Sequence, residues 1–327
     1  MNCAIKREHY PMQTVEDIMT RMPNAKFMTV LDANHGFWQI QLDEESSKLC
    51  TFNTCFGRYR FNRLPFGIKS APEVFTRTVR QLFENLEGVE VVVDDILVWG
   101  STLQEHDKRL EEVLKQVRRS NLKLNKDKCK FRQSEVIYLG HLLTSKGMKP
   151  DPSKVNAVTE MPIPTNAKEL QRFLGMVTYL SKFIPNVSQI AAPLRKILEK
   201  DVLWDWGKHQ AESFNKLKFA LSHAPCLAYF DVDKPLTLSV DASSKALGAC
   251  ILQDGRPIAY ASKALTASEQ NYAQIEKEMY AIVFGCERFH DFLYGHADIS
   301  VQTDHKPLEI ILKKPVAYMP HQCACNG

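Results

Sequence analysis

The feature that most constrains the fold is the run Val89–Trp99, in which two β-branched segments flank the adjacent carboxylates Asp94 and Asp95. Apolar β-branched runs on both sides of a short polar turn predict a buried β-hairpin with the acids at its tip. Adjacent carboxylates repel each other unless a cation or a base neutralises them. An isolated pair of acids in a loop is usually just solvated, but the flanking strands favour a metal site.

A second strand signal also ends in an acid. The apolar segment Phe27–Leu31 leads into Asp32, which a strand would place at the edge of its sheet, within reach of solvent and a metal. We call Asp32, Asp94 and Asp95 the first acid cluster. Carboxylates without His or Cys suit Mg²⁺, and two such ions roughly 3.5–4 Å apart form the site that polymerases use.

A second group of acids lies in the last third of the sequence. Asp241 and Asp304 follow strand-like segments, whereas Glu278 lies within a helical pattern. We call Asp241, Glu278 and Asp304 the second acid cluster. Glu276 competes with Glu278 for the helical position, and a glutamate on a helix is most often an ordinary surface residue.

Strand and helix signals are mixed in the first part of the chain, and the fold class expected is α+β. Prolines between 150 and 165 mark a boundary, after which helices follow to about residue 222. The elements expected are strands at 37–42, 136–143, 236–240, 247–252, 257–262 and 299–303, and helices at 71–86, 103–119 and about 274–293.

Composition excludes some classes of protein. No stretch of 18 uncharged apolar residues occurs and the N-terminus has no signal-peptide core, so we expect an intracellular, cytoplasmic protein. The nine cysteines are expected to be reduced. His321, Cys323 and Cys325 lack a second ligand pair, which disfavours a zinc site. Eight basic residues against one acid between Lys115 and Arg132 suit a phosphate backbone, or simply a solvated surface.

Ordered motifs run through nearly the whole sequence, and together they resemble the reverse transcriptase–RNase H region of gypsy-like LTR retrotransposons. The matching segments are His9–Pro11, Leu31–Ile40, Thr51–Phe52, Phe56–Tyr59, Leu64–Phe75, Val93–Val98, Tyr138–His141, Arg172–Gly175, Ala192–Leu194, Val240–Ser243, Ala259–Ser262, Glu276–Met279 and Thr303–Leu308.

The resemblance implies roles for residues in the first part. Asp32, Asp94 and Asp95 would be the catalytic acids and metal ligands of an RNA-directed DNA polymerase, with two Mg²⁺ ions per site and Mn²⁺ as an alternative. Phe37 would be a steric gate against the ribose 2′-hydroxyl, although alone it would be read as a core aromatic. The implied nucleotide-binding residues also include Phe66 and Gly67, and the implied primer contacts are Leu139 and Gly140. Val92 stands where the family usually has Tyr.

For the last part, the resemblance implies an RNase H domain that uses Asp241, Glu278 and Asp304 as catalytic acids and metal ligands. A fourth acid is expected from a later helix and is absent from this sequence. The implied partners are a primed RNA or DNA template, deoxynucleotides and an RNA–DNA hybrid, with no membrane. A protease and an integrase are expected in the same polyprotein, and a retroelement particle is the expected location.

The domains expected are a palm with partial fingers at 1–145, a thumb or connection at 146–225, a C-terminally truncated RNase H-like α/β domain at 226–315, and an unrelated tail at 316–327. Fingers strands with basic triphosphate-binding residues are expected upstream. Two alternatives stay open: a catalytically impaired, nucleic-acid-binding remnant of a broken retroelement, and an unrelated metal-dependent phosphohydrolase.

Overall fold

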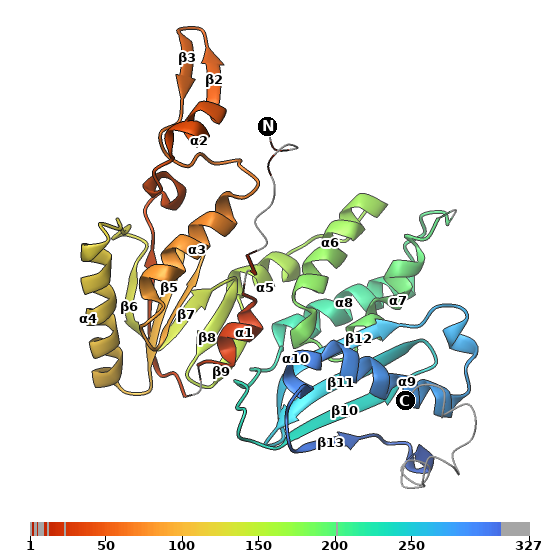
Figure 1. The fold of residues 1–327 in the computed structure, drawn as a ribbon. Coiled ribbons are helices and arrows are strands. Elements are labelled where there is room, and N and C mark those ends of the chain that lie inside the picture. The colour runs from red at the N-terminus through yellow and green to blue at the C-terminus, as the bar shows by residue number, and fades with distance from the viewer. Residues whose placement is uncertain are drawn as a thin grey trace. The chain divides into compact units, whose positions relative to one another are not determined.

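The computed structural model describes residues 2, 5, 10–11, 13–22, 24–200 and 202–308. The motif residue His9, the disfavoured zinc ligands of the tail and the expected end of the last domain lie outside these residues. The chain divides into two compact units, Met1–Ser145 and Lys146–Gly327, and Figure 1 traces both.

The first unit is built on a four-stranded sheet in the order β4-β5-β1-β6. One hydrophobic cluster joins apolar side chains of β1, β4 and β5 to the apolar stripes of α3 and α4, so both helices pack on this sheet. The bounds are β1 Phe27–Asp32, β4 Val89–Val92, β5 Asp95–Gly100, β6 Lys130–Gln133, α3 Ala71–Phe83 and α4 Leu103–Arg119.

Smaller elements complete this unit. A two-stranded hairpin projects beyond α3 in Figure 1, and all of its strand residues are exposed. A second hairpin, β7–β8, follows β6. The bounds are α1 Val15–Met19, η1 Gly36–Gln39, α2 Glu44–Leu49, β2 Thr51–Thr54, β3 Gly57–Arg60, β7 Glu135–Tyr138 and β8 His141–Thr144.

The second unit begins with a short strand and four main helices and ends in a four-stranded sheet of order β12-β11-β10-β13. Helix α9 packs on the face formed by Leu247, Ala249 and Ile251 of β11, while Asn186 at the start of α7 approaches Gly248. Since successive strand residues point to opposite faces, α7 and α9 cover opposite sides of the sheet. The bounds are β9 Gly147–Pro150, α5 Pro152–Thr159, α6 Ala167–Tyr179, η2 Ser181–Phe183, α7 Val187–Lys196, α8 Lys208–Ser222, β10 Leu236–Ala242, β11 Ala246–Gln253, β12 Arg256–Ala264, η3 Glu269–Asn271, α9 Gln274–Arg288, α10 His290–Leu293 and β13 Ile299–Gln302.

Most expected elements are present, but two expectations were wrong. Residues 37–42 form no strand: a 3₁₀ turn occupies Gly36–Gln39, because His35 adopts a left-handed backbone (φ 49°) that turns the chain. The ring of Phe37 then packs against Phe75, so its burial does not need a strand. The helix expected over 274–293 is interrupted at Phe289, which separates α9 from α10.

Two compositional expectations were tested. The six cysteines within the described residues form no disulfide. In that same part of the chain, no helix is both long and apolar enough to cross a membrane.

Candidate active sites

Strand pairing brings the first acid cluster together. Asp32 ends β1 and lies directly opposite Asp95, the first residue of β5, in the antiparallel register. Asp94 precedes Asp95 in the turn between β4 and β5, and its carbonyl accepts a hydrogen bond from the Ala33 amide at 2.8 Å. The backbone ladder therefore fixes the positions of all three acids at one end of the sheet.

The turn that carries these acids is strained. Val93 has φ 50°, which a β-branched residue rarely adopts. Such strain costs of order 1–3 kcal/mol and persists where the surrounding structure holds it. Val92, at the position where the family usually has Tyr, is 6% exposed and packs into the sheet.

Burial and mutual repulsion make the first acid cluster electrostatically unfavourable. Burial raises the pKa of Asp94, and the charge of Asp32 adds to the effect. Burial likewise raises the pKa of Asp95, with further contributions from Asp32 and Asp94. The Oδ1 atom of Asp94 is buried and accepts no hydrogen bond from the described residues. A cation would relieve both penalties.

One side-chain cation lies beside the first acid cluster. The Lys128 ammonium is 3.3 Å from Asp32 Oδ2, and its charge opposes the rise in pKa of Asp94 and Asp95. Sequence reasoning placed Lys128 only within a basic stretch. The contact joins residues 96 positions apart, so no local pattern could have identified it.

Gly36 is a second residue that sequence reasoning missed. A Cβ atom at this position would lie 2.1 Å from Asp94 Oδ1 and 2.7 Å from the Phe75 ring. Glycine is therefore required for Asp94 to occupy its place. The only sequence signal was the turn-like composition of residues 32–36.

The residues expected to contact nucleotide lie together. The Phe37 ring centroid is 5.0 Å from that of Phe66 and 5.6 Å from that of Phe75. Phe66 is 55% exposed, and Gly67 has φ 85°, a conformation that favours glycine. Phe66 and Gly67 also line a pocket of about 380 Å³, together with Phe52 and Phe61.

The expected primer-contact residues form the turn of the β7–β8 hairpin. Leu139 (φ 48°) and Gly140 (φ 70°) both have positive φ, as the central residues of a type I′ turn require. The preceding residue, Tyr138, is 1% exposed, and its hydroxyl lies 3.5 Å from the carbonyl oxygen of Asp95. Burial raises the pKa of Tyr138 well above its usual value, and the charge of Asp95 adds to the effect.

The second acid cluster gathers side chains from three elements. One carboxylate oxygen from each of Asp241, Glu278 and Asp304 lies within 4.8 Å of the others. Asp241 belongs to β10, Glu278 to α9, and Asp304 follows β13. Among the described residues, the oxygens of the first acid cluster are not gathered this closely.

Glu278 is held in place by Gln274, which sequence reasoning also missed. The Gln274 amide donates to Glu278 Oε1 at 2.9 Å and to the Ala242 carbonyl at 2.8 Å. Glu278 is 3% exposed, and its other oxygen, Oε2, is buried without a hydrogen-bond donor among the described residues. Burial raises the pKa of Glu278, with smaller contributions from Asp304 and Asp241. The four-residue spacing on one helix was the available signal.

Both clusters suit hard divalent cations. Their donor sets are carboxylates, and each contains a buried oxygen that no described protein group satisfies: Asp94 Oδ1 in the first and Glu278 Oε2 in the second. Buried polar atoms without partners are rare in folded proteins and often mark a ligand site. Glu276, the competing helical acid, instead accepts a hydrogen bond from the Ala273 amide at the start of α9.

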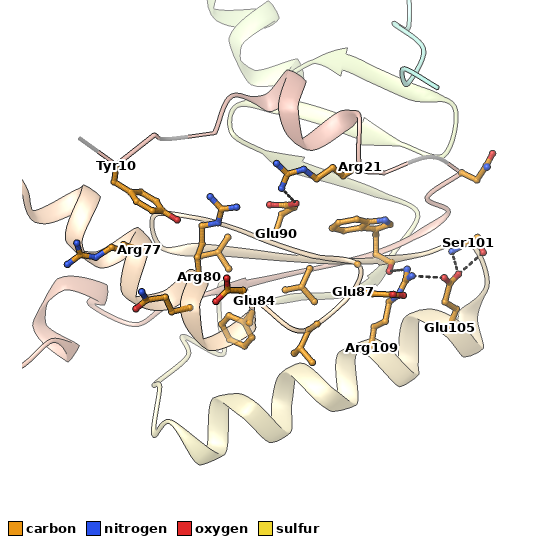
Figure 2. A pocket seen from close by; sticks show the side chains of 18 residues that line it. Tyr10, Arg21, Arg77, Arg80, Glu84, Glu87, Glu90, Ser101, Glu105 and Arg109 are labelled. Atoms are coloured by element: carbon orange, nitrogen blue, oxygen red, sulfur yellow. Dashed lines mark hydrogen bonds and ion pairs between the residues drawn. The ribbon is translucent and has the colours of Figure 1, made fainter. Parts of the chain in front are cut away.

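A charged pocket of about 820 Å³ in the first unit contains none of the expected site residues (Figure 2). Arg21 pairs with the buried Glu90 at 2.8 Å, and Arg109 pairs with Glu105 at the same distance. Because these charged side chains pair with each other, the pocket does not by itself indicate a catalytic or binding function.

Two family models match the sequence. Residues 1–143 match "Reverse transcriptase (RNA-dependent DNA polymerase)", and residues 206–301 match "RNase H-like domain found in reverse transcriptase". The second match begins at residue 206, just before α8. The sequence had predicted that this domain begins at residue 226.

Curated relatives and solved structures are similar over most of the chain. The Pol polyprotein of the Drosophila melanogaster transposon 297 is 38% identical over 95% of this chain, and that of the transposon gypsy is 34% identical over 92%. This chain spans only 30% of either relative. A foamy viral protease-reverse transcriptase in complex with double-stranded DNA is 26% identical, with a TM-score of 0.88 over 97% of this chain and 57% of that one. Another, in complex with an RNA/DNA hybrid, has a TM-score of 0.82.

Proposed function

Because the chain carries the reverse transcriptase and RNase H-like regions of a gypsy-like retrotransposon Pol polyprotein, we propose that it is an RNA-directed DNA polymerase whose active site is the first acid cluster. The observation that carries the proposal is the strand register that sets Asp32 opposite Asp95, with Asp94 beside it. Three carboxylates at one end of the sheet, with one unsatisfied buried oxygen, provide the donors that phosphoryl-transfer chemistry needs.

The protein groups have distinct tasks in this proposal. Asp32, Asp94 and Asp95 would hold two Mg²⁺ ions, with Mn²⁺ as an alternative, and the ions would supply charge neutralisation as the primer 3′-hydroxyl attacks the α-phosphate and pyrophosphate leaves. The Phe37 ring, packed between Phe66 and Phe75, excludes a ribose 2′-hydroxyl and thereby selects deoxynucleotides. The turn at Gly67 admits the nucleotide and template close to the backbone.

Primer and template contacts are assigned outside the acid cluster. The Leu139–Gly140 turn contacts the primer, and the segment 146–225 acts as a thumb or connection. The substrates are a primed RNA or DNA template and deoxynucleotides. We place the protein in the cytoplasm, within a retroelement particle, as part of a polyprotein that also contains a protease and an integrase.

The second unit supports a second activity, cleavage of the RNA strand of an RNA–DNA hybrid. The convergence of Asp241, Glu278 and Asp304 within 4.8 Å carries this proposal. These side chains would hold divalent ions, which would supply charge neutralisation as a water molecule attacks the phosphodiester and one of its ester oxygens leaves. Cleavage that depends on Asp241 would support the assignment; cleavage unaffected by Asp241→Asn would contradict it.

Primer extension with Mg²⁺ tests the main proposal. Asp94→Asn should lower the extension rate about a thousandfold, because several kcal/mol of charge stabilisation are lost. Asp205→Asn, an exposed acid outside both clusters, is the matched control and should leave the rate unchanged. If the wild-type protein extends no primer, or if Asp94→Asn extends normally, the polymerase proposal is wrong and the impaired-remnant alternative is favoured.

A further inference from the structure

A β-bulge interrupts the pairing of β6 with β1. The pairs on either side of it are Met28 with Gln133 and Val30 with Lys130. Phe131 and Arg132 of β6 therefore oppose the single residue Thr29 of β1. Arg132 adopts φ 49°, in the left-handed region that favours glycine. Because a bulge bends the strand that carries it, the bulge determines the direction in which the chain leaves β6.

Side chains bond the backbone groups at the bulge. The Arg132 amide donates to the Thr29 hydroxyl at 3.1 Å, and the Gln133 side-chain amide donates to the Phe131 carbonyl at 2.7 Å. Backbone groups near a break in a β-ladder need partners of this kind. The side chains therefore stabilise a backbone conformation that arginine adopts only with strain.

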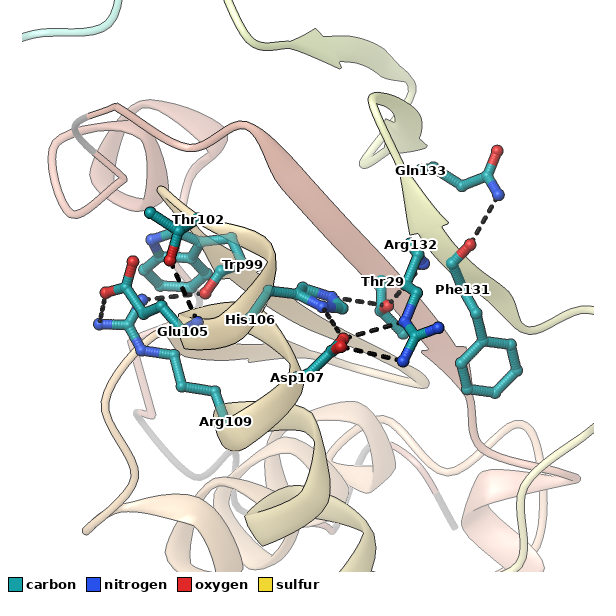
Figure 3. Close-up of polar contacts among 10 residues, drawn as sticks. All are labelled: Thr29, Trp99, Thr102, Glu105, His106, Asp107, Arg109, Phe131, Arg132 and Gln133. Carbon is teal, nitrogen blue, oxygen red and sulfur yellow. Dashed lines mark hydrogen bonds and ion pairs between the residues drawn. The ribbon is translucent and has the colours of Figure 1, made fainter.

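A polar network holds the same bulge to helix α4. His106 Nε2 lies 2.9 Å from the Thr29 hydroxyl, and His106 Nδ1 lies 3.1 Å from Asp107 Oδ1. Asp107 accepts two hydrogen bonds from the Arg132 guanidinium, both at 2.9 Å. Figure 3 shows these side chains meeting from β1, α4 and β6. We call Thr29, His106, Asp107 and Arg132 the polar network.

The polar network resembles a catalytic triad in composition but cannot act as one. Thr29 and His106 are both 0% exposed, so no substrate reaches the hydroxyl or the imidazole. The start of α4 also packs closely on β5, since a Cβ atom at Gly100 would lie 2.6 Å from the backbone nitrogen of His106. The network therefore connects the bulge to a rigid helix rather than to a ligand.

The bulge lies directly before the hairpin that carries the proposed primer contacts. Strand β6 ends at Gln133, and β7 begins at Glu135. Tyr138, in β7, is 1% exposed, and its hydroxyl lies 3.5 Å from the carbonyl oxygen of Asp95. The Leu139–Gly140 turn follows at once. The direction that the chain takes at the bulge therefore affects where this turn lies relative to the first acid cluster.

Loss of the bulge would move the chain by a large distance on the scale of catalysis. Regular pairing of β6 would shift the residues after the bulge by one position, about 3.3 Å along the strand. A misplacement on the order of 1 Å can lower a rate about a hundredfold. The φ of Arg132 favours this shift because it is strained, and the polar network opposes it.

We propose that Arg132 is a positioning residue of the polymerase: the bulge at Arg132, held by the polar network, fixes the Leu139–Gly140 turn against the primer end. This inference rests on the proposed function, because the primer belongs to that function. Its test measures placement of the primer end without chemistry, so it can fail separately.

The test uses the full chain and a primer–template with 2-aminopurine at the primer 3′ end. The fluorescence of this base reports how well it stacks on its neighbour. Binding of the wild type should shift the fluorescence, and Arg132→Ala should bind the primer–template but lose the shift. The extension rate of Arg132→Ala should fall about a hundredfold. An unchanged shift in Arg132→Ala would overturn the inference.

Arg132→Gly separates the backbone conformation from the side chain. Glycine adopts a positive φ without strain, so this variant should keep the bulge and most of the fluorescence shift. Asp107→Asn should lose part of the shift in the wild-type background and cause no further loss in the Arg132→Gly background. It also serves as the second variant if Arg132→Ala does not fold. Equal loss in Arg132→Gly and Arg132→Ala would overturn the inference, because the bulge conformation would then not matter.

Arg109→Ala is the matched control for loss of stability. The Arg109 guanidinium donates to the Trp99 carbonyl at 2.9 Å and pairs with Glu105 at 2.8 Å, so its partners lie in β5 and α4. Arg109→Ala and Arg132→Ala should both lower the unfolding temperature, but Arg109→Ala should keep the fluorescence shift. Equal loss of the shift in both variants would contradict positioning and indicate a general loosening of α4.

The two proposals can be told apart. A protein that shifts the terminal base through Arg132 but extends no primer disproves the polymerase activity and keeps the inference. A protein that extends primers equally well with and without the Arg132→Ala substitution overturns the inference and keeps the polymerase activity.

Discussion

The two acid clusters, which we propose bind divalent cations, are assembled by different structural means. In the first, adjacent strands of one sheet set the acids in place, and the Asp32–Asp95 register fixes them through backbone hydrogen bonds. In the second, side chains from β10, α9 and the segment after β13 converge to within 4.8 Å. The first cluster has the Lys128 ammonium beside it, whereas Gln274 orients the central acid of the second.

The two sites should therefore be sensitive to different substitutions. A site defined by strand register should tolerate changes in surrounding side chains. It should not tolerate an added side chain where the backbone closely contacts one of the acids. A site defined by converging side chains depends on the groups that orient them. Among the supporting residues, Gly36 should therefore matter most at the first cluster, and Gln274 at the second.

Among the residues that support the acids, Gly36→Ala is expected to have the largest effect. Its Cβ would lie 2.1 Å from Asp94 Oδ1, so the carboxylate must move. A displacement on the order of 1 Å can lower the rate about a hundredfold, and primer extension measures it. Mn²⁺ binding at the second acid cluster serves as the control and should not change. Extension at the wild-type rate would show that the first cluster is not fixed by close backbone contact.

Gln274→Leu should have the next largest effect, at the second cluster. Loss of the hydrogen bond to Glu278 Oε1 frees that carboxylate to rotate, which should weaken Mn²⁺ binding about tenfold, as is typical for groups that orient a metal ligand. Electron paramagnetic resonance of free Mn²⁺ measures the affinity. Gln104→Leu, at an exposed position on α4, is the control. Unchanged affinity would mean that packing of α9 alone positions Glu278.

Glu278→Gln should have the smallest effect, a gain in stability without metal. Burial raises the pKa of Glu278 above its ordinary value of 4.5, so the folded state holds this proton more tightly than the unfolded chain. Protonated Glu278 therefore stabilises the folded state. This stabilisation is fully present below pH 4.5 and is lost as the pH rises through the raised pKa of the folded state.

At pH 7.5 with EDTA, the uncharged Glu278→Gln variant should therefore unfold at a slightly higher temperature than the wild type, and the difference should disappear near pH 4. Exposed Glu287→Gln, on the same helix, is the control. A lower unfolding temperature for Glu278→Gln than for the wild type at pH 7.5 would show that the charged Glu278 carboxylate does not destabilise the fold.

Elements with a regular apolar pattern could be predicted from the sequence. The stripes of α3 and α4 and the β4–β5 hairpin were recognisable because each buries one periodic set of side chains. The hairpin β2–β3 was not predicted, since its residues are all exposed and give no alternating burial signal. The turn at Gly36–Gln39 was mistaken for a strand, because alternation of polar and apolar residues does not reveal a left-handed residue such as His35.

The acids of both clusters could be proposed from the sequence because each follows a strand or lies in a helical motif. Their supporting groups could not. Lys128 reaches Asp32 across 96 residues, and the Thr29–His106 contact spans 77. Contacts of this kind depend on how distant elements pack, which no local pattern encodes.

The most direct test of the account counts divalent ions at the two clusters. A Mn²⁺ binding isotherm would be recorded for the wild type, Asp94→Asn, Asp241→Asn and the double variant. If the two clusters are separate metal sites, each single variant removes a separate class of bound ions, and the double variant loses both. If neither substitution changes the isotherm, or if each abolishes all binding, the claim of two independent carboxylate metal sites is contradicted.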